Sequence, residues 1–114
     1  MDSCIFCKIA EKEMPSDIIY EDDKVVAFND VNPQSPIHFL IIPKEHIPSA
    51  DYLNEENVSI ISHIFLVINK IVKEKDLNGK GYRIVNNCGE LGGQTVAHIH
   101  FHVLSGRQLG WPPG

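Results

Sequence analysis

The sequence predicts one α+β domain, in which an antiparallel sheet of about five strands packs with one long and one short helix. The chain has 114 residues, the usual size of one domain, so residues 1–114 are treated as one unit. Its 43% hydrophobic and 22% charged residues are typical of a folded globular chain. Several short stretches have strand patterning, and one long stretch has helical patterning.

The first half of the chain predicts the short helix and three strands. Apolar residues recur at three- and four-residue spacing over residues 5–10, and Pro15 follows, so a short amphipathic helix is expected there. Two strands, Ile18–Glu21 and Lys24–Asn29, are expected to form a hairpin around two aspartates. A third strand is expected at about His38–Ile42, between two prolines.

The long helix is expected to begin at an Asn54 cap and to end near Lys75. Its expected core stripe consists of Val58, Ile61, Ile64, Phe65, Ile68, Ile71 and Val72. Ile60, Leu66 and Val67 widen this stripe. Two interpretations stay open: a thoroughly buried helix, or a second apolar face used for self-association.

The last third of the chain predicts two strands around a glycine-rich loop. Asn78–Gly81 is expected to end the helix, and a strand is expected at about Tyr82–Asn86. The glycine-rich loop covers residues 88–94. The final strand is expected at about Val96–Leu104, with alternating residues on opposite faces. One face would carry His98, His100 and His102.

Composition excludes several classes of function. Fifteen acidic residues against ten Lys plus Arg give a net charge of −5, so no broad basic surface is available for nucleic acid. No apolar stretch is long enough to span a membrane, and Met1–Ser3 is acidic where a signal peptide would be basic, so a cytoplasmic protein is expected. In such a compartment the pair Cys4 and Cys7 favours a metal or redox site over a disulfide.

Three histidines in strict alternation favour chemistry over core packing. A lone strand histidine is usually structural, but this triple lies opposite an apolar face. Imidazole can attack phosphorus while neutral and leave again when protonated near neutral pH, which are the requirements for a covalent nucleotidyl carrier. The preceding glycines let backbone N–H groups approach phosphate oxygens. Thr95 adds a hydroxyl that could bond a bridging or leaving-group atom.

Nearly the whole chain resembles the histidine triad family, and within it the histidine triad nucleotide-binding protein branch. The central motif is His98-Ile-His-Phe-His-Val-Leu104 with the Gly92-Gly93-Gln94-Thr95-Val96 segment before it. Further matching segments are Tyr20-Glu21-Asp22-Asp23, Pro33-Gln34-Ser35-Pro36, Ile42-Pro43-Lys44-Glu45-His46 and the terminal Trp111-Pro112-Pro113-Gly114.

The resemblance implies a purine nucleoside phosphoramidase, which cleaves the P–N bond of adenosine 5′-phosphoramidate-type substrates. His100 would be the nucleophile, and His102 would hold a nonbridging phosphate oxygen. Thr95 and Gln94 would sit by the phosphate and the leaving group. His38 matches a position that orients the triad, although a strand-start histidine is as often structural. No organic cofactor is expected.

The expected nucleotide site extends beyond the histidines. Asn87 matches the family's asparagine beside the phosphate, and Asp30 matches its ribose-hydroxyl carboxylate. Without the family, Asp30 could simply be a turn residue. Gly93 and Val96 belong to the expected phosphate segment. The side chains that could line an apolar slot for the purine are Ile5, Phe6, Ile9, Phe28, Val31 and Leu40.

A zinc site is expected at the first cysteine pair. Cys4-x-x-Cys7 has the spacing of half a tetrahedral zinc site. By resemblance, His46 and His98 would complete it, which would remove His98 from catalysis. The alternative is a pair of reduced core cysteines.

The resemblance also implies a homodimer in which two sheets join and Trp111 reaches the partner's site. Two rival functions stay open. One is a dinucleoside polyphosphate hydrolase or nucleotidyl transferase that uses the same His100 chemistry on a P–O bond. The other is a non-catalytic nucleotide or metal sensor, in which His98, His100 and His102 bind one metal together.

Overall fold

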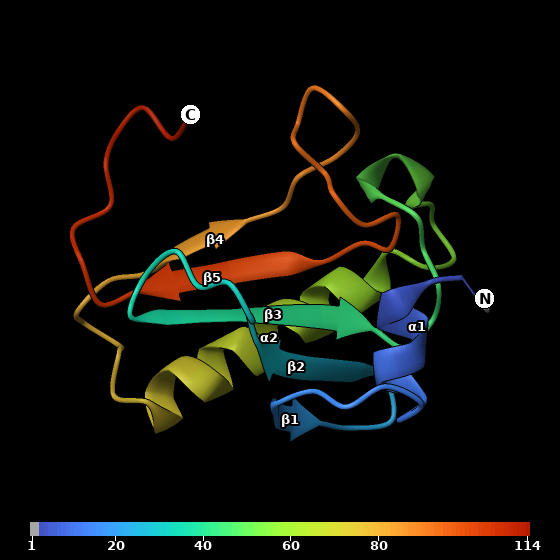
Figure 1. The fold of residues 1–114 in the computed structure, drawn as a ribbon, viewed down its shortest axis with the longest axis horizontal. Helices are drawn as coiled ribbons and strands as arrows, with labels where there is room; N and C mark the ends of the chain where they lie inside the picture. The colour runs from blue at the N-terminus through green and yellow to red at the C-terminus, as the bar shows by residue number, and fades with distance from the viewer. Residues whose placement is uncertain (1–2) are drawn as a thin grey trace.

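The computed structural model describes residues 3–114 and confirms the predicted fold class (Figure 1). Met1 and Asp2, which entered the expectation about a signal peptide, lie outside the described residues. One antiparallel sheet has the strand order β1-β2-β3-β5-β4. The elements are α1 (Ile5–Ala10), β1 (Ile18–Glu21), β2 (Val25–Asn29), β3 (Ile37–Pro43), the 3₁₀ turn η1 (Ala50–Tyr52), α2 (Ser59–Glu74), β4 (Arg83–Val85) and β5 (Phe101–Ser105).

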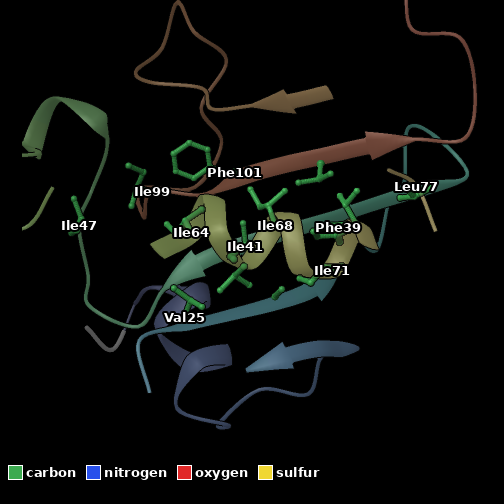
Figure 2. Packing of buried hydrophobic residues seen from close by; sticks show 14 residues of the cluster. Val25, Phe39, Ile41, Ile47, Ile64, Ile68, Ile71, Leu77, Ile99 and Phe101 are labelled. Carbon is green, nitrogen blue, oxygen red and sulfur yellow. The ribbon is translucent and has the colours of Figure 1, made fainter. Parts of the chain in front are cut away.

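The two faces of the sheet carry separate hydrophobic clusters, because successive strand residues point to opposite sides. From β3, Phe39 and Ile41 join the cluster that packs against α2 (Figure 2). Leu40 and Ile42 point the other way and pack with α1. On this face the short helix packs against residues of both β2 and β3. In residues 3–114 no helix combines the length and the hydropathy that crossing a bilayer requires.

Of the two interpretations of helix α2, the thoroughly buried helix is wrong, because part of its apolar surface is exposed. It begins at Ser59, and Asn54 instead caps the preceding turn, where its Oδ1 accepts from the N–H groups of Glu56 and Asn57 at 2.8 and 3.1 Å. Phe65 was expected in the core, yet it is 46% exposed, and neighbouring Leu66 is 68% exposed. The sheet covers only one side of the helix, so these side chains remain on its outer surface.

The final strand starts five residues later than predicted. Strand β5 begins at Phe101, so His98 and His100 precede it and only His102 lies within it. The reason is a competing backbone contact, in which the N–H of Ile99 donates to the carbonyl of Ile47 at 2.7 Å. This contact ties the segment to the chain that leaves β3. The side-chain alternation nevertheless persists, because Ile99, Phe101 and Val103 all join the cluster against α2, while the rings of His100 and His102 lie next to each other with centroids 5.1 Å apart.

The β1–β2 turn is held to α2 by His63. His63 Nε2 lies 2.7 Å from Asp22 Oδ2. The other oxygen of Asp22 accepts from the N–H groups of Lys24 and Val25. Burial alone would raise the pKa of Asp22, but these donors, with His63 and Tyr20, hold it well below its ordinary value.

Candidate active site and metal centre

His100 is buried and directly precedes β5. Its hydrogen bonding shows which of its two ring nitrogens carries the proton. Its side chain is 3% exposed. Nδ1 lies 2.8 Å from the backbone carbonyl oxygen of His98, so Nδ1 carries the proton and donates it. The Nε2 atom therefore keeps a free lone pair. The ring of Phe6 stands edge-on to the imidazole, with centroids 5.1 Å apart at 83°, and limits its rotation.

Neutral His102 carries its proton on the other ring nitrogen, Nε2, whereas His100 carries it on Nδ1. The contact between His38 and His102 determines this tautomer. The N–H of Gln34 donates to His38 Nδ1 at 3.0 Å, so the proton of neutral His38 is on Nε2. That Nε2–H faces His102 Nδ1 at 2.9 Å and Asp30 Oδ2 at 3.4 Å, and the shorter contact is the stronger hydrogen bond. His102 Nδ1 is thus the acceptor, and its Nε2 carries a proton that is free to be donated.

Electrostatics keep these rings neutral at physiological pH. Burial lowers the pKa of His100, an effect opposed by its bond to the His98 carbonyl and by Asp30. Burial, followed by repulsion from His100 and His38, lowers the pKa of His102 to about 4. Burial also lowers the pKa of His38, against the pull of Asp30. A neutral imidazole is the form that acts as a nucleophile.

A second cluster brings the four expected metal ligands together: Cys4, Cys7, His46 and His98. Cys4 and Cys7 both belong to the N-terminal turn of α1, His46 follows β3, and His98 precedes β5. All four ligand atoms lie within 4.8 Å of one another. His98 is completely buried. Segments far apart in the sequence meet at this one point.

The contacts in this cluster fit a tetrahedral cation. Sulfur-to-nitrogen distances are 3.3 Å for Cys4–His98 and 3.2 Å for Cys7–His46, and the two Nδ1 atoms of His46 and His98 are 3.1 Å apart. Bonds of about 2.3 Å to sulfur and about 2.0 Å to nitrogen would place tetrahedral ligands roughly 3.3 to 3.8 Å apart. His98 Nε2 donates to the carbonyl of Pro43 at 2.8 Å, which leaves its Nδ1 unprotonated toward the cluster.

The two cysteines of this cluster also have contacts that are compatible with metal binding. The N–H of Cys7 donates to Cys4 Sγ at 3.3 Å. Burial, followed by the neighbouring Cys4, raises the pKa of the Cys7 thiol to about 11. A metal ion bound here would displace that proton. Cys4, Cys7, His46 and His98 are therefore able to hold a metal ion of the kind that prefers two sulfur and two nitrogen ligands.

The three histidines of the motif do not share one group of potential metal ligands. His98 belongs to the cysteine cluster, whereas His102 belongs with His38 and Asp30, and His100 lies in neither group of potential ligands. Within residues 3–114 the motif thus does not converge on one metal position. Each histidine instead has its own hydrogen-bond partner.

The glycine-rich loop is braced by Gln94. Its Oε1 accepts from the N–H of Gly89 at 2.9 Å, and its Nε2 donates to the carbonyls of Pro48 and Val96. Both ends of this side-chain amide are therefore engaged within the chain. Gly93 has a φ of +82°, which favours glycine. Thr95 is exposed beside this loop, in a shallow hollow that it shares with Cys4 and His46.

The expected purine-slot residues fall into two groups. Phe6, Ile9, Phe28 and Leu40 are buried in the α1 cluster, together with Cys4 and Cys7. Val96 packs partly buried against them. By contrast, Ile5 is 43% exposed and Val31 is 98% exposed. Asp30 follows β2, where its Oδ1 accepts from the N–H of Asn32 at 2.8 Å.

The C-terminal tail lies beside the edge strand β4. Trp111 is 82% exposed. It lines an open groove together with Asn87, Arg83 and Arg107. Arg83 fixes the tail, since its Nη2 donates to the carbonyl of Gly110 at 2.7 Å.

Several supporting groups were missed from the sequence because most of them are backbone atoms. The Gln34 N–H and the Pro43 and His98 carbonyls set the histidine tautomers, and any residue type offers such groups. Asn86 donates to the His100 carbonyl at 2.9 Å. Its neighbour Asn87 was the asparagine assigned to the site, and nothing in the sequence alone distinguished a role for Asn86.

Comparison with known proteins identifies a matching protein family. The family model described as "Scavenger mRNA decapping enzyme C-term binding" matches residues 3–110. An uncharacterised HIT-like protein of Synechococcus elongatus is 46% identical over 113 residues, which are 99% of this chain and 98% of the relative.

Two crystal structures are also similar. One is a HIT family hydrolase from Legionella pneumophila, with a TM-score of 0.96 and 44% identity over 98% of this chain and 100% of that one. The other is a histidine triad protein from Clostridium difficile, with a TM-score of 0.93 and 53% identity over 96% and 95% of the two chains.

Proposed function

The chain belongs to the histidine triad (HIT) family, and from that premise we propose that it is a purine nucleoside phosphoramidase of the nucleotide-binding branch. Its substrates are adenosine 5′-phosphoramidate-type compounds, in which an amine is bonded to the phosphorus of a purine nucleoside monophosphate. The products are the nucleoside monophosphate and the free amine.

The observation that carries this proposal is the pair of opposite tautomers at His100 and His102. His100 donates through Nδ1 and keeps a lone pair on Nε2. His102 accepts through Nδ1 and keeps a proton on Nε2. The two ring centroids are 5.1 Å apart. One nucleophile and one hydrogen-bond donor thus lie side by side, as attack on a phosphoryl group requires.

The reaction proceeds in two steps, formation and hydrolysis of a nucleotidyl-histidine. In the first, His100 Nε2 forms a bond to phosphorus while the P–N bond breaks, and the departing amine takes one proton from the solvent. In the second, the oxygen of a water molecule bonds to phosphorus while the bond to His100 Nε2 breaks, and that water releases one proton to the solvent. His102 Nε2–H donates to a nonbridging oxygen and stabilises the charge that develops there. Thr95 and Gln94 lie by the leaving group.

The nucleoside is held by groups around the histidines. Asp30 accepts from the ribose hydroxyls, and Asn87, Gly93 and Val96 border the phosphate. The apolar side chains of the α1 face contact the purine, with Phe6 already packed against His100. The side chains of this apolar slot are Ile5, Phe6, Ile9, Phe28, Val31 and Leu40.

The metal of the cysteine cluster is zinc. Two thiolates and two imidazoles are a donor set that zinc prefers, and the spacing of the ligand atoms supports it. The ion is structural: it cross-links α1, the chain after β3 and the chain before β5, and supplies no step of the reaction. No organic cofactor takes part.

The active form is a cytoplasmic homodimer in which two sheets join. Two features support association: β4 forms an edge of the sheet, and Phe65 and Leu66 leave an apolar surface on α2. Trp111 reaches the partner's site, on the side of the amine. Its exposed, proline-flanked tail supports that role.

Single-turnover trapping tests the function. Excess enzyme is mixed with an adenosine phosphoramidate, quenched, and mapped by mass spectrometry. We expect a nucleotidyl adduct on His100 that is absent in His100→Ala and present in His63→Ala, a histidine outside the site. Turnover of a dinucleoside polyphosphate with none of a phosphoramidate would favour the rival P–O hydrolase. An adduct on another histidine would contradict the assignment.

A further inference from the structure

His98 takes part in both the metal cluster and the nucleophile's environment through different atoms. Its side-chain Nδ1 lies 3.3 Å from Cys4 Sγ and 3.1 Å from His46 Nδ1. Its backbone carbonyl accepts the Nδ1–H of His100 at 2.8 Å. The group that fixes the tautomer of the nucleophile thus belongs to a residue whose side chain is a metal ligand.

Two further hydrogen bonds restrict the position of the His98 segment. The ring is fully buried and donates from Nε2 to the Pro43 carbonyl at 2.8 Å. The next residue, Ile99, donates its N–H to the Ile47 carbonyl at 2.7 Å. The ring, the carbonyl and the following amide therefore move as one unit, so a displacement of the ring is passed to the carbonyl.

Without a cation, the cluster is held only by weak sulfur–nitrogen contacts of 3.2 to 3.5 Å. Because His98 Nε2 holds its proton toward Pro43, its Nδ1 presents a lone pair to His46 Nδ1 and to both cysteine sulfur atoms. A cation satisfies these electron-rich atoms together. Without it, the side chains are expected to move apart, and His98, the most buried of the four, transmits that movement to its own backbone.

We propose that His98 is a positioning residue through which occupancy of the Cys4/Cys7/His46/His98 cluster sets the tautomer of His100. With the metal bound, the His98 carbonyl holds the proton of His100 on Nδ1. When the metal is lost, this acceptor shifts, and the ring also populates the Nε2–H tautomer, which has no lone pair facing the phosphorus. The catalytic consequence rests on the proposed role of His100 as nucleophile, but the tautomer itself does not.

The direct test reads the tautomer by NMR of protein with ¹⁵N-labelled histidines. Zinc is titrated into chelator-treated wild-type protein, with bound metal measured on the same samples. We expect the His100 ring nitrogens to change from a mixture to the Nδ1–H tautomer in proportion to occupancy. Cys4→Ala should leave the mixture in place, while Cys88→Ala, a cysteine outside the cluster, should titrate like wild type. If Cys4→Ala does not fold, the wild-type titration decides alone.

The second readout is the single-turnover rate of nucleotidyl transfer on the same samples. We expect a loss of about 10-fold to 100-fold on metal removal, the range found when an outer hydrogen-bond partner is lost, with nucleotide affinity changed less than twofold. An unchanged tautomer across the titration would overturn the inference. If no sample cleaves a phosphoramidate but the tautomer follows the metal, the proposed function fails and the coupling holds.

Discussion

His38 Nε2 lies 2.9 Å from His102 Nδ1, and this contact decides which end of the His102 ring carries a proton. The partner on the far side of His38 is the backbone N–H of Gln34 at 3.0 Å. A chain of two hydrogen bonds thus fixes a donor at the candidate active site.

His38→Ala removes the donor to His102 and should lower kcat about 10-fold to 100-fold. KM should change little, because the loss concerns the orientation of a group that acts in the transition state. His38→Gln keeps a side-chain N–H and should recover part of kcat. Steady-state kinetics on one phosphoramidate measures all three proteins. Equal loss in the Ala and Gln variants would show that packing, not the hydrogen bond, matters.

Removal of the metal should destabilise the chain. A ligand present at about 100 times its dissociation constant contributes roughly 2.7 kcal/mol to folding, and a chelator should lower Tm accordingly. Cys4→Ala should have a lower Tm than wild type and bind less zinc, as measured by calorimetry and metal analysis. Cys88→Ala is the matched cysteine control. Protein prepared without chelators and free of zinc would contradict the assignment.

Asp22 should support stability only above acidic pH. Its pKa is lowered in the folded state from about 3.9 in the unfolded chain. Its contribution is therefore complete well above pH 4 and is lost as the pH falls from about 4 toward the folded-state pKa. Asp22→Asn should lower the free energy of unfolding at pH 7 by about 1 to 3 kcal/mol, and by less at pH 3.

Denaturant titrations at the two pH values test this prediction. Asp23→Asn serves as the control, because Asp23 is exposed and adjacent. A difference between Asp22→Asn and wild type that is the same at pH 3 and pH 7 would refute the role of the carboxylate charge.

Deleting the residues after Arg107 should alter amine selectivity more than nucleotide binding. The tail carries Trp111, whose side chain is exposed and can therefore contact the site of a partner chain. We expect the ratio of kcat/KM between a bulky and a small amine to change about 10-fold, as expected for loss of an apolar contact of 1 to 3 kcal/mol. Trp111→Phe should keep most of the ratio. Identical ratios in the truncated and full chains would exclude Trp111 from substrate selection.

Leu66→Glu should weaken self-association, because it places a charge on the exposed apolar surface of α2. Light scattering coupled to gel filtration gives the mass. Lys70→Glu, on an exposed position of the same helix, is the charge control. A dimer unaffected by Leu66→Glu would leave the β4 edge as the joining surface.

The strands and helices, in their order along the chain, could be predicted from the sequence because each stretch has its own hydrophobic periodicity. The final strand was misjudged since Val96–His100 alternates like a strand, and only the contact of Ile99 with Ile47 draws it away. Phe65 was misjudged because periodicity reports an apolar face and not whether anything covers it. In the candidate site, residue types pointed to the four potential metal ligands that the structure brings together and to the proposed nucleophile, but tautomers depend on backbone groups that composition does not encode.

Helix α1 has only six residues, too few to be stable as an isolated helix. The carbonyls of the two cysteines accept hydrogen bonds at its two ends, Cys4 from the N–H of Lys8 at 3.1 Å and Cys7 from the N–H of Glu11 at 3.0 Å. The exchange of these amide protons with deuterium should therefore report directly on the cluster. Slow exchange would mark loaded chains and fast exchange empty ones, which makes the N-terminal peptide a label-free gauge of metal status in a mixed population.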